Sequence, residues 1–198
     1  MSLPALWELD LCANWEVFPV ARYGMLLDLT ACAGCMACTV GCQMQNELAP
    51  EVHYIKFYQQ EFGTFPDVSL LNIPVQCQHC ENPPCVYNCP TGASYIGDGG
   101  IVLIDEHRCI GCKYCMTSCP YNARVLDEET KTPVKCVFCF EQIHKGEQPM
   151  CVRTCIGDAR IFGDLDDPEG ELVRAINERH ARPLRPDLGT EPKFFYVW

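Results

Sequence analysis

The pattern of apolar and polar positions predicts short strands and little helix. Residues 23–29 are an apolar run that predicts a buried strand. Residues 52–58 and 68–73 mix aromatic and β-branched residues with polar ones, and they predict two strands within an insertion. Residues 93–96 and 101–104, separated by an Asp-Gly-Gly turn, predict a hairpin. Further on, residues 164–170 are an acidic loop and residues 171–180 predict a short helix.

Cysteine content changes this picture. The chain has 198 residues, 48% of them hydrophobic, which allows one compact domain or two small ones. Seventeen cysteines is an odd number, and most of them fall in repeated groups of four, so the pattern indicates metal rather than disulfides. Thiols that bind metal must stay reduced until the metal is inserted, so we expect assembly in a reducing cytosol.

Sixteen cysteines form four blocks of four. In chain order the blocks are Cys32, Cys35, Cys38 and Cys42; Cys77, Cys80, Cys85 and Cys89; Cys109, Cys112, Cys115 and Cys119; and Cys136, Cys139, Cys151 and Cys155. The third block, followed by Pro120, has the Cys-x2-Cys-x2-Cys-x3-Cys-Pro spacing of bacterial 4Fe–4S ferredoxins. In that motif the first three thiolates bind one cluster and the fourth binds another. Blocks are therefore expected to exchange their fourth cysteines in pairs.

An internal repeat supports pairing. Residues 27–35 align without a gap with residues 104–112, and the second block aligns more loosely with the fourth. A proline follows only Cys89 and Cys119, which links blocks two and three and leaves blocks one and four as the other pair. Two alternatives remain: each block holds its own cluster, or the cysteines bind zinc. Zinc sites usually use widely separated Cys-x2–4-Cys pairs, whereas blocks one and three place three cysteines within seven residues.

Charge and hydropathy exclude several partners. The net charge of −11 argues against nucleic acid and anionic lipid. No apolar run is long enough to span a bilayer, and the first residues have neither a secretory signal nor a twin arginine. Residues 1–22, with Trp7, Trp15 and Phe18, are expected to form an arm packed on this protein or a partner; Cys12 there lies outside every block. No nucleotide-binding glycine motif or nucleophile–base set is present.

The block order and spacings resemble the iron–sulfur subunits of the dimethyl-sulfoxide reductase family of molybdopterin oxidoreductases. Residues 77–85, 89–93, 163–168 and 189–196 are most similar to the beta subunits of polysulfide reductase and respiratory arsenate reductase. The resemblance covers residues 23–198. Two departures are the extension over residues 1–22 and Ile156, which follows Cys155 where a proline is usual.

The resemblance implies four ligand sets. The first is Cys32, Cys35, Cys38 and Cys155; the second is Cys42, Cys136, Cys139 and Cys151; the third is Cys77, Cys80, Cys85 and Cys119; the fourth is Cys89, Cys109, Cys112 and Cys115. Nitrate-reductase-like members have a tryptophan at the position of Cys112 and a 3Fe–4S cluster there. The cysteine in this chain implies four 4Fe–4S clusters.

The expected fold is α+β, with two ferredoxin-like modules of two 4Fe–4S clusters each, related by the internal repeat. The expected segments are an arm (1–22), an outer module (23–50 with 133–165), an insertion (51–73), an inner module (74–128) and a tail (166–198). Fully ligated clusters leave no open iron for a substrate. The chain is therefore expected to transfer electrons and to have no catalytic site of its own.

Two functional hypotheses follow. In the first, the chain is the subunit that carries electrons between a membrane quinone-reactive subunit and a molybdopterin catalytic subunit in anaerobic respiration. Its partners are then that catalytic subunit and a polytopic quinone-binding protein. It would lie peripherally on a bacterial membrane, in the periplasm through co-export with a twin-arginine partner, with the cytoplasm as the alternative. In the second hypothesis, it is a free-standing soluble polyferredoxin.

Several polar residues near the cysteines have two interpretations. Four cations could raise nearby reduction potentials or could only pair with surface carboxylates: Arg108, Lys113, Lys135 and Arg153. His79 and His107 could serve a quinone site or a proton relay, but local hydrogen bonds are the commoner use of such residues. The acidic pairs at 128–129 and 166–167 are expected to be solvated loops.

Overall fold

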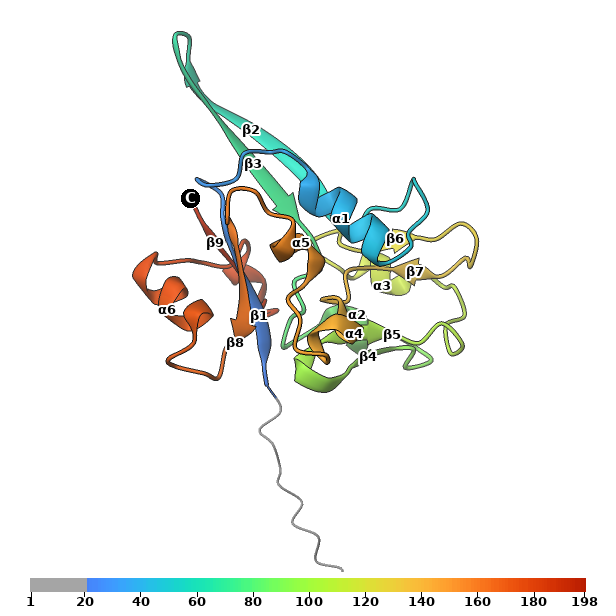
Figure 1. Ribbon diagram of the computed structural model, residues 1–198. Helices are drawn as coiled ribbons and strands as arrows, with labels where there is room; N and C mark the ends of the chain where they lie inside the picture. Colours follow the sequence, from blue (N-terminus) through green and yellow to red (C-terminus); the bar gives the residue numbers. More distant parts are fainter. Residues whose placement is uncertain (1–20) are drawn as a thin grey trace, which may run out of the picture.

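A three-stranded sheet lies at one side of the molecule, and cysteine-bearing loops and short helices make up most of the other side (Figure 1). The structure is a computed structural model that describes residues 21–198. The arm expected over residues 1–22, with Cys12, therefore lies outside the described residues except for its last two positions. The secondary structure mixes small sheets with short helices, as the α+β prediction requires.

The central strand of the main sheet is the predicted buried strand. β1 (Tyr23–Asp28) pairs antiparallel with β8 (Arg160–Asp164) and parallel with β9 (Phe194–Val197). The middle residues of β1 are fully buried because they have a neighbouring strand on both sides and α6 (Glu171–Glu178) on one face. The apolar run over residues 23–29 predicted β1, and the helix predicted over residues 171–180 contains all of α6. The role of β9 as a sheet strand was missed.

The insertion forms a long two-stranded hairpin that projects from the body (Figure 1). β2 (Lys56–Thr64) pairs with β3 (Asp67–Val75) over nine residue pairs. The predicted start of the first strand at Val52 was wrong. Val52 and Ile55 are buried outside any strand, whereas the ribbon continues through exposed polar and aromatic residues from Tyr58 to Thr64. Cross-strand pairing therefore decided the strand limits here, and apolar character did not.

Two smaller hairpins lie beside the cysteine loops. The predicted one is present as β4 (Ser94–Ile96) and β5 (Val102–Ile104), joined through the one-turn helix η1 (Asp98–Gly100). The other joins β6 (Val125–Leu126) to β7 (Pro133–Val134). A further one-turn helix, η2 (Pro186–Leu188), precedes β9.

The remaining helices are short, and most of them follow a cysteine. They are α1 (Ala37–Gln45), α2 (Pro84–Tyr87), α3 (Tyr114–Thr117), α4 (Phe140–Ile143) and α5 (Met150–Arg153). Within residues 21–198, no helix is long and apolar enough to cross a membrane.

An aromatic stack joins the cysteine-bearing half of the molecule to the sheet. The Phe138 ring lies parallel to His79 at a centroid distance of 4.0 Å and parallel to Phe194 of β9 at 5.3 Å. Phe162 of β8 meets Phe138 edge-on at 5.3 Å. All four residues are at most 9% exposed, so the stack is part of the main core. Aromatic pairs of this kind contribute about 0.5–1.5 kcal/mol each beyond their burial.

Candidate iron–sulfur centres

Blocks one and three share an unusual backbone path. Gly34 and Gly111, each placed between the first two cysteines of its block, have φ angles of 67° and 65°. Met36 and Lys113, directly after the second cysteine, both have φ of 60° and begin α1 and α3. The left-handed conformation is easy for glycine and costly for the other two residues. The same tight loop is thus built twice, at positions 77 residues apart.

Blocks two and four share another path. His79 and Phe138 each precede the second cysteine of their block and have φ angles of 43° and 54°. In both blocks a proline, Pro83 or Pro149, precedes the short helix that carries the third cysteine. His79 and Phe138 therefore hold corresponding positions, and they are the residues that stack on each other at 4.0 Å.

Three of the four expected ligand sets each line one small cavity. Cys32, Cys35 and Cys38 share theirs with Cys155. Cys42 shares a second cavity with Cys136, Cys139 and Cys151. Cys77, Cys80 and Cys85 share a third with Cys119. Each cavity thus takes three cysteines from one block and one from another.

The fourth expected set lies nearer the surface. Its members are Cys89 after α2, Cys109 and Cys112 in the loop before α3, and Cys115 within α3. Cys112 is exposed and the other three are partly buried. Burial raises the pKa of the Cys115 thiol, and the neighbouring Cys109 thiol adds to the shift.

These groups have the chemistry that an iron–sulfur cluster needs. All sixteen described cysteines are free thiols. Within residues 21–198, no group of three or more His, Cys, Asp or Glu is placed to hold a single metal ion. Several backbone amides also donate to sulfur, among them Ala159 N to Cys155 Sγ at 3.3 Å and Ser94 N to Cys89 Sγ at 3.4 Å. Such hydrogen bonds stabilise a thiolate and tune the potential of a bound cluster.

Burial favours the protonated form of several of these thiols when no metal is bound. It raises the pKa of Cys42 and Cys80 to about 12, and that of Cys151 to about 11. Cluster insertion must therefore displace protons, because only the thiolate binds iron.

Comparison with known proteins agrees with this chemistry. Residues 68–165 match the family model described as a 4Fe–4S dicluster domain. The chain is 40% identical over 187 residues to the tetrathionate reductase B subunit of Salmonella typhimurium, covering 92% of this chain and 74% of that protein. It is also 40% identical over 179 residues to the polysulfide reductase B subunit of Wolinella succinogenes, covering 89% of this chain and 94% of that protein. The chain belongs to the iron–sulfur B subunits of the molybdopterin oxidoreductases.

The arsenate respiratory reductase iron–sulfur subunit of a Shewanella species is a more distant relative, at 32% identity over 224 residues, or 89% of this chain and 96% of that protein. As in the other B subunits, the cofactors are 4Fe–4S clusters, four per chain. The chain is thus an electron-transfer subunit of a reductase complex, and it is not the catalytic subunit. The hypothesis of a free-standing polyferredoxin does not fit these relatives.

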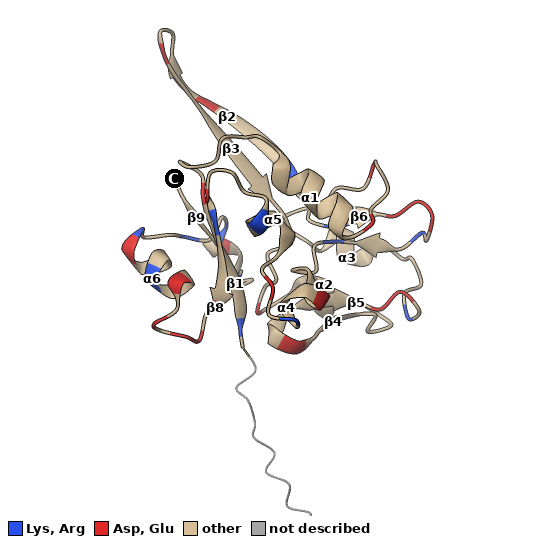
Figure 2. Cartoon of the chain, viewed as in Figure 1, with Lys and Arg blue, Asp and Glu red and all other residues tan. Residues whose placement is uncertain are grey.

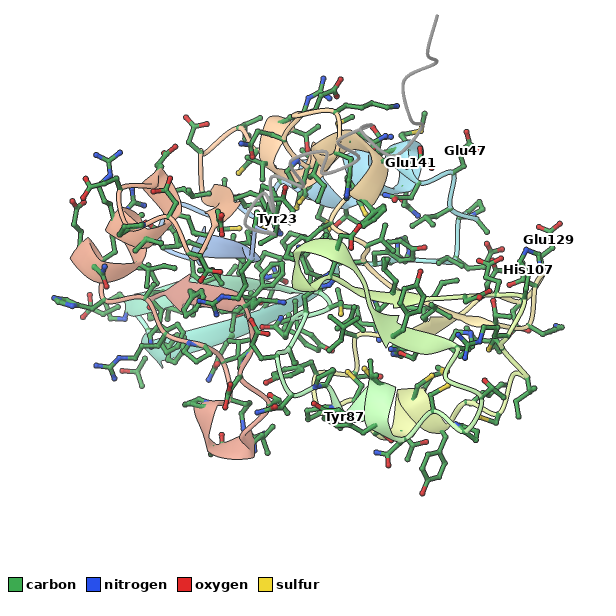
Figure 3. All side chains as sticks on the ribbon, turned by 90° about the horizontal axis from the view of Figure 1, so that it is seen from below. Tyr23, Glu47, Tyr87, His107, Glu129 and Glu141 are labelled. Carbon is green, nitrogen blue, oxygen red and sulfur yellow. The ribbon has the colours of Figure 1, made fainter. Side chains whose placement is uncertain are left out.

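The two histidines named from the sequence, His79 and His107, lie in different surroundings. His79 is fully buried, and its Nδ1 accepts a hydrogen bond from the backbone N–H of Val102 at 3.1 Å. Desolvation lowers its pKa, so His79 is neutral. His107 and Glu129 lie at the periphery of the molecule (Figure 3). Asp166 pairs with Arg22 at 2.8 Å on the surface, as expected for a solvated acidic loop.

Of the four cations named from the sequence, only Lys135 is buried, at 2% exposure. Arg108 and Lys113 are exposed, and Arg153 pairs with Glu147 on the surface at 2.9 Å. Charged residues of both signs are otherwise spread over loops and helices (Figure 2).

Sequence reasoning missed two buried arginines, Arg124 and Arg160, which are 2% and 4% exposed. A signal for them was available. Each follows the last cysteine of its block by five residues and comes directly after an alanine; Ser94 holds the same position after Cys89.

Proposed function

We propose that this B subunit holds its four clusters in crosswise ligand sets and carries electrons between a molybdopterin catalytic subunit and a polytopic quinone-binding membrane subunit. The proposed sets are Cys32, Cys35, Cys38 and Cys155; Cys42, Cys136, Cys139 and Cys151; Cys77, Cys80, Cys85 and Cys119; and Cys89, Cys109, Cys112 and Cys115. The clusters supply one-electron carriers, and the chain fixes their positions and tunes their potentials.

The observation that carries the crosswise sets is the composition of three cavities. Each is lined by three cysteines of one block and one cysteine of another block that is far away in sequence. If each block held its own cluster, the four cysteines of a block would be expected to meet in one cavity. Cys155 instead lines the cavity of the first block, and Cys119 lines that of the second.

The proposal includes a doubled ferredoxin arrangement, with an outer module from residues 23–50 and 133–165 and an inner module from residues 74–128. Packing supports it, because α1 contacts α5 and α2 contacts α3. The paired φ values of Gly34 with Gly111 and of His79 with Phe138 also fit a repeat. The insertion over residues 51–73, which holds most of the β2–β3 hairpin, and the tail over residues 166–198 are then additions to the two modules.

Apolar side chains surround the two cluster sites that are nearest the surface. Met36 is 48% exposed and Ile156 is 74% exposed beside the first set. Ile110, Tyr114 and Tyr87 are 58–67% exposed beside the fourth set, and Tyr87 lies at the edge of the molecule in Figure 3. Exposed apolar groups next to the end carriers suit docking of one redox partner at each end. In the proposed order the first set faces the catalytic subunit and the fourth faces the membrane subunit.

In this arrangement the subunit lies peripherally on a bacterial membrane as part of its complex. The proposed side is the periplasm, reached by co-export with a partner that carries a twin-arginine signal. Fractionation of cells into periplasm, membrane and cytoplasm tests the side, and a complex attached to the cytoplasmic face would contradict it.

The experiment for the ligand sets uses two cysteines of one block. Cys155→Ser is expected to alter the cluster built on Cys32, Cys35 and Cys38, whereas Cys151→Ser is expected to alter the cluster built on Cys136 and Cys139. The readout is the electron paramagnetic resonance spectrum of each reduced variant, together with its iron content. If both substitutions change the same signal and spare the other, block four holds its own cluster and the crosswise sets are wrong.

A further inference from the structure

Arg160 connects the first two ligand sets. It lines the first cavity, and its Nη2 lies 3.7 Å from Sγ of Cys38. Its Nη1 donates to Oε1 of Gln76 at 3.1 Å, and Gln76 lines the second cavity. Burial alone lowers the pKa of Arg160, but Cys151 of the second set and Cys38 of the first raise it. One guanidinium is thus shared between two sites.

Lys135 connects the second set to the third. Its Nζ donates to the carbonyl oxygen of Cys136 at 2.9 Å, and Cys136 belongs to the second set. The same Nζ also donates to the carbonyl oxygen of Val102, a residue that lines the third cavity. The side chain is 2% exposed.

Arg124 connects the third set to the fourth. It lines the third cavity, and its Nη2 donates to Oγ of Ser94 at 2.6 Å. The backbone N–H of Ser94 in turn donates to Sγ of Cys89, a member of the fourth set. Burial alone lowers the pKa of Arg124, but Cys85 of the third set and Cys115 of the fourth raise it.

None of these three cations has a counter-charge from a carboxylate within the described part of the chain. All the ion pairs found over residues 21–198 involve other cations. Nε and Nη1 of Arg124 are buried without any hydrogen-bond partner among these residues. A buried charge is costly unless an opposite charge compensates it. Among the groups that can carry negative charge, the cysteine sulfurs act most strongly on all three side chains.

We propose that Arg160 and Arg124 each place a fixed positive charge between two consecutive clusters, Arg160 between the first and second and Arg124 between the third and fourth, and that each raises the reduction potentials of both clusters that it adjoins. The inference rests on the proposed ligand sets. Reduction adds one electron to a site that already carries negative charge. A cation between two sites favours the electron on either of them. In each transfer one site is oxidised and the next is reduced, and no proton moves, because arginine keeps its charge.

The test changes the charge at two junctions. Arg160→Gln and Arg124→Gln remove the charge and leave a shorter polar side chain, whereas Arg160→Lys and Arg124→Lys retain the charge. The matched control is Arg153→Gln, a substitution in the fourth block that removes an exposed charge paired with Glu147. Each variant is purified anaerobically in its complex, its iron is counted, and the midpoint potential of each cluster is measured by titration followed with electron paramagnetic resonance. Cys155→Ser, Cys151→Ser, Cys119→Ser and Cys112→Ser assign the signals to the four sets.

We expect Arg160→Gln to lower the potentials of the first and second clusters and to leave the other two unchanged. The expected size is at least a tenfold fall in the reduction equilibrium, which is about 59 mV for one electron. Arg124→Gln should do the same to the third and fourth clusters. In the lysine variants and in Arg153→Gln, the reduction equilibrium of every cluster should stay within threefold of that in the parent protein.

Unshifted potentials in a glutamine variant with full iron would overturn the proposal, and so would equal shifts in all four clusters. If a glutamine variant loses a cluster, the corresponding lysine variant decides the question. Full iron and a near-parent potential in the lysine variant support the role of the charge. Loss of the cluster or a large shift of its potential in the lysine variant rejects that role. A failure of the proposed ligand sets can be told apart from a failure of this inference. If the ligand sets are wrong, the four cysteine variants will not each alter a different cluster signal.

Discussion

Replacing Gly34 by alanine tests whether the tight loop of the first block depends on glycine. Its φ of 67° costs a residue with a side chain about 1–2 kcal/mol. Alanine also lowers the conformational entropy of the unfolded chain, which stabilises the folded protein by about 0.4–1 kcal/mol. The net backbone effect of the substitution is therefore a loss of about 1 kcal/mol in the free energy of unfolding. The new Cβ would also stand 2.8 Å from the side-chain amide of Asn72.

Asn72 must move to relieve that contact, and moving it breaks two hydrogen bonds. Its Nδ2 donates to the carbonyl oxygen of Cys32 at 3.4 Å, and its Oδ1 accepts from Gln59 at 3.0 Å. At about 0.5–1.5 kcal/mol each, these bonds add about 2 kcal/mol, so Gly34→Ala should cost about 3 kcal/mol. Gly146→Ala is the matched control. Gly146 has φ of 78° with no atom within 4 Å of a Cβ, so its cost should be only about 1 kcal/mol.

The assay is the rate at which the cluster-loaded protein unfolds in a fixed urea concentration without oxygen, followed by far-ultraviolet circular dichroism. We choose unfolding rates over equilibrium free energies of unfolding, because proteins with tightly bound cofactors do not unfold in a two-state equilibrium. A difference of about 2 kcal/mol makes Gly34→Ala unfold up to about 30-fold faster than Gly146→Ala. The double variant Gly34→Ala/Asn72→Ala should unfold about as fast as Gly34→Ala, because the same two bonds are lost in both. Additive effects of the two substitutions would refute this account of the loop.

Two further predictions concern metal content and stability. Anaerobically prepared protein should contain about sixteen iron and sixteen sulfide per chain, and Cys12→Ser should not change either value; about eight of each in protein that has lost no cluster would contradict four sites. Asp28→Asn should lower the free energy of unfolding by about 1–3 kcal/mol, because the Asp28 carboxylate accepts hydrogen bonds from Thr30 and Ala31 and pairs with Arg179 at 3.1 Å. Desolvation raises the pKa of Asp28, but these contacts outweigh it and hold the pKa below its ordinary value. The stabilisation from the carboxylate is therefore complete above about pH 4. The loss of unfolding free energy in Asp28→Asn should be equal at pH 6 and pH 8.

The sequence was most informative where local chemistry decides the structure. The apolar run of β1 and the Asp-Gly-Gly turn between β4 and β5 were predictable because burial and turn geometry act over a few residues. The cysteine spacing likewise predicted the cofactor, since the ferredoxin motif is specific.

The features that the sequence did not predict depend on contacts between residues far apart in the chain. β9 becomes a strand only because β1 offers a free edge, more than 160 residues earlier in the chain. The buried positions of Arg124 and Arg160 depend on which cavities lie on either side of them. His79 was expected to bond locally, but its stacking on Phe138 requires that two distant blocks meet. β9 and the stack of His79 on Phe138 leave no periodic trace in the sequence, whereas the two arginines can be recognised by their fixed distance after the last cysteine of a block.

β1 is made early, but both strands that pair with it, β8 and β9, are made near the end of this sequence. The main sheet can therefore form only after most of these residues have been synthesised. At about 5–20 residues per second, about 6–23 s separate the synthesis of Cys38 from that of Cys155. In the proposed sets, the third and fourth sites have all their cysteines once Cys119 is made, whereas the first and second must wait for block four. β1 meanwhile has two unpaired edges, which favour aggregation. The inner clusters can thus be inserted while the chain is still growing. The outer pair must wait for Cys155, and the main sheet must wait for β9.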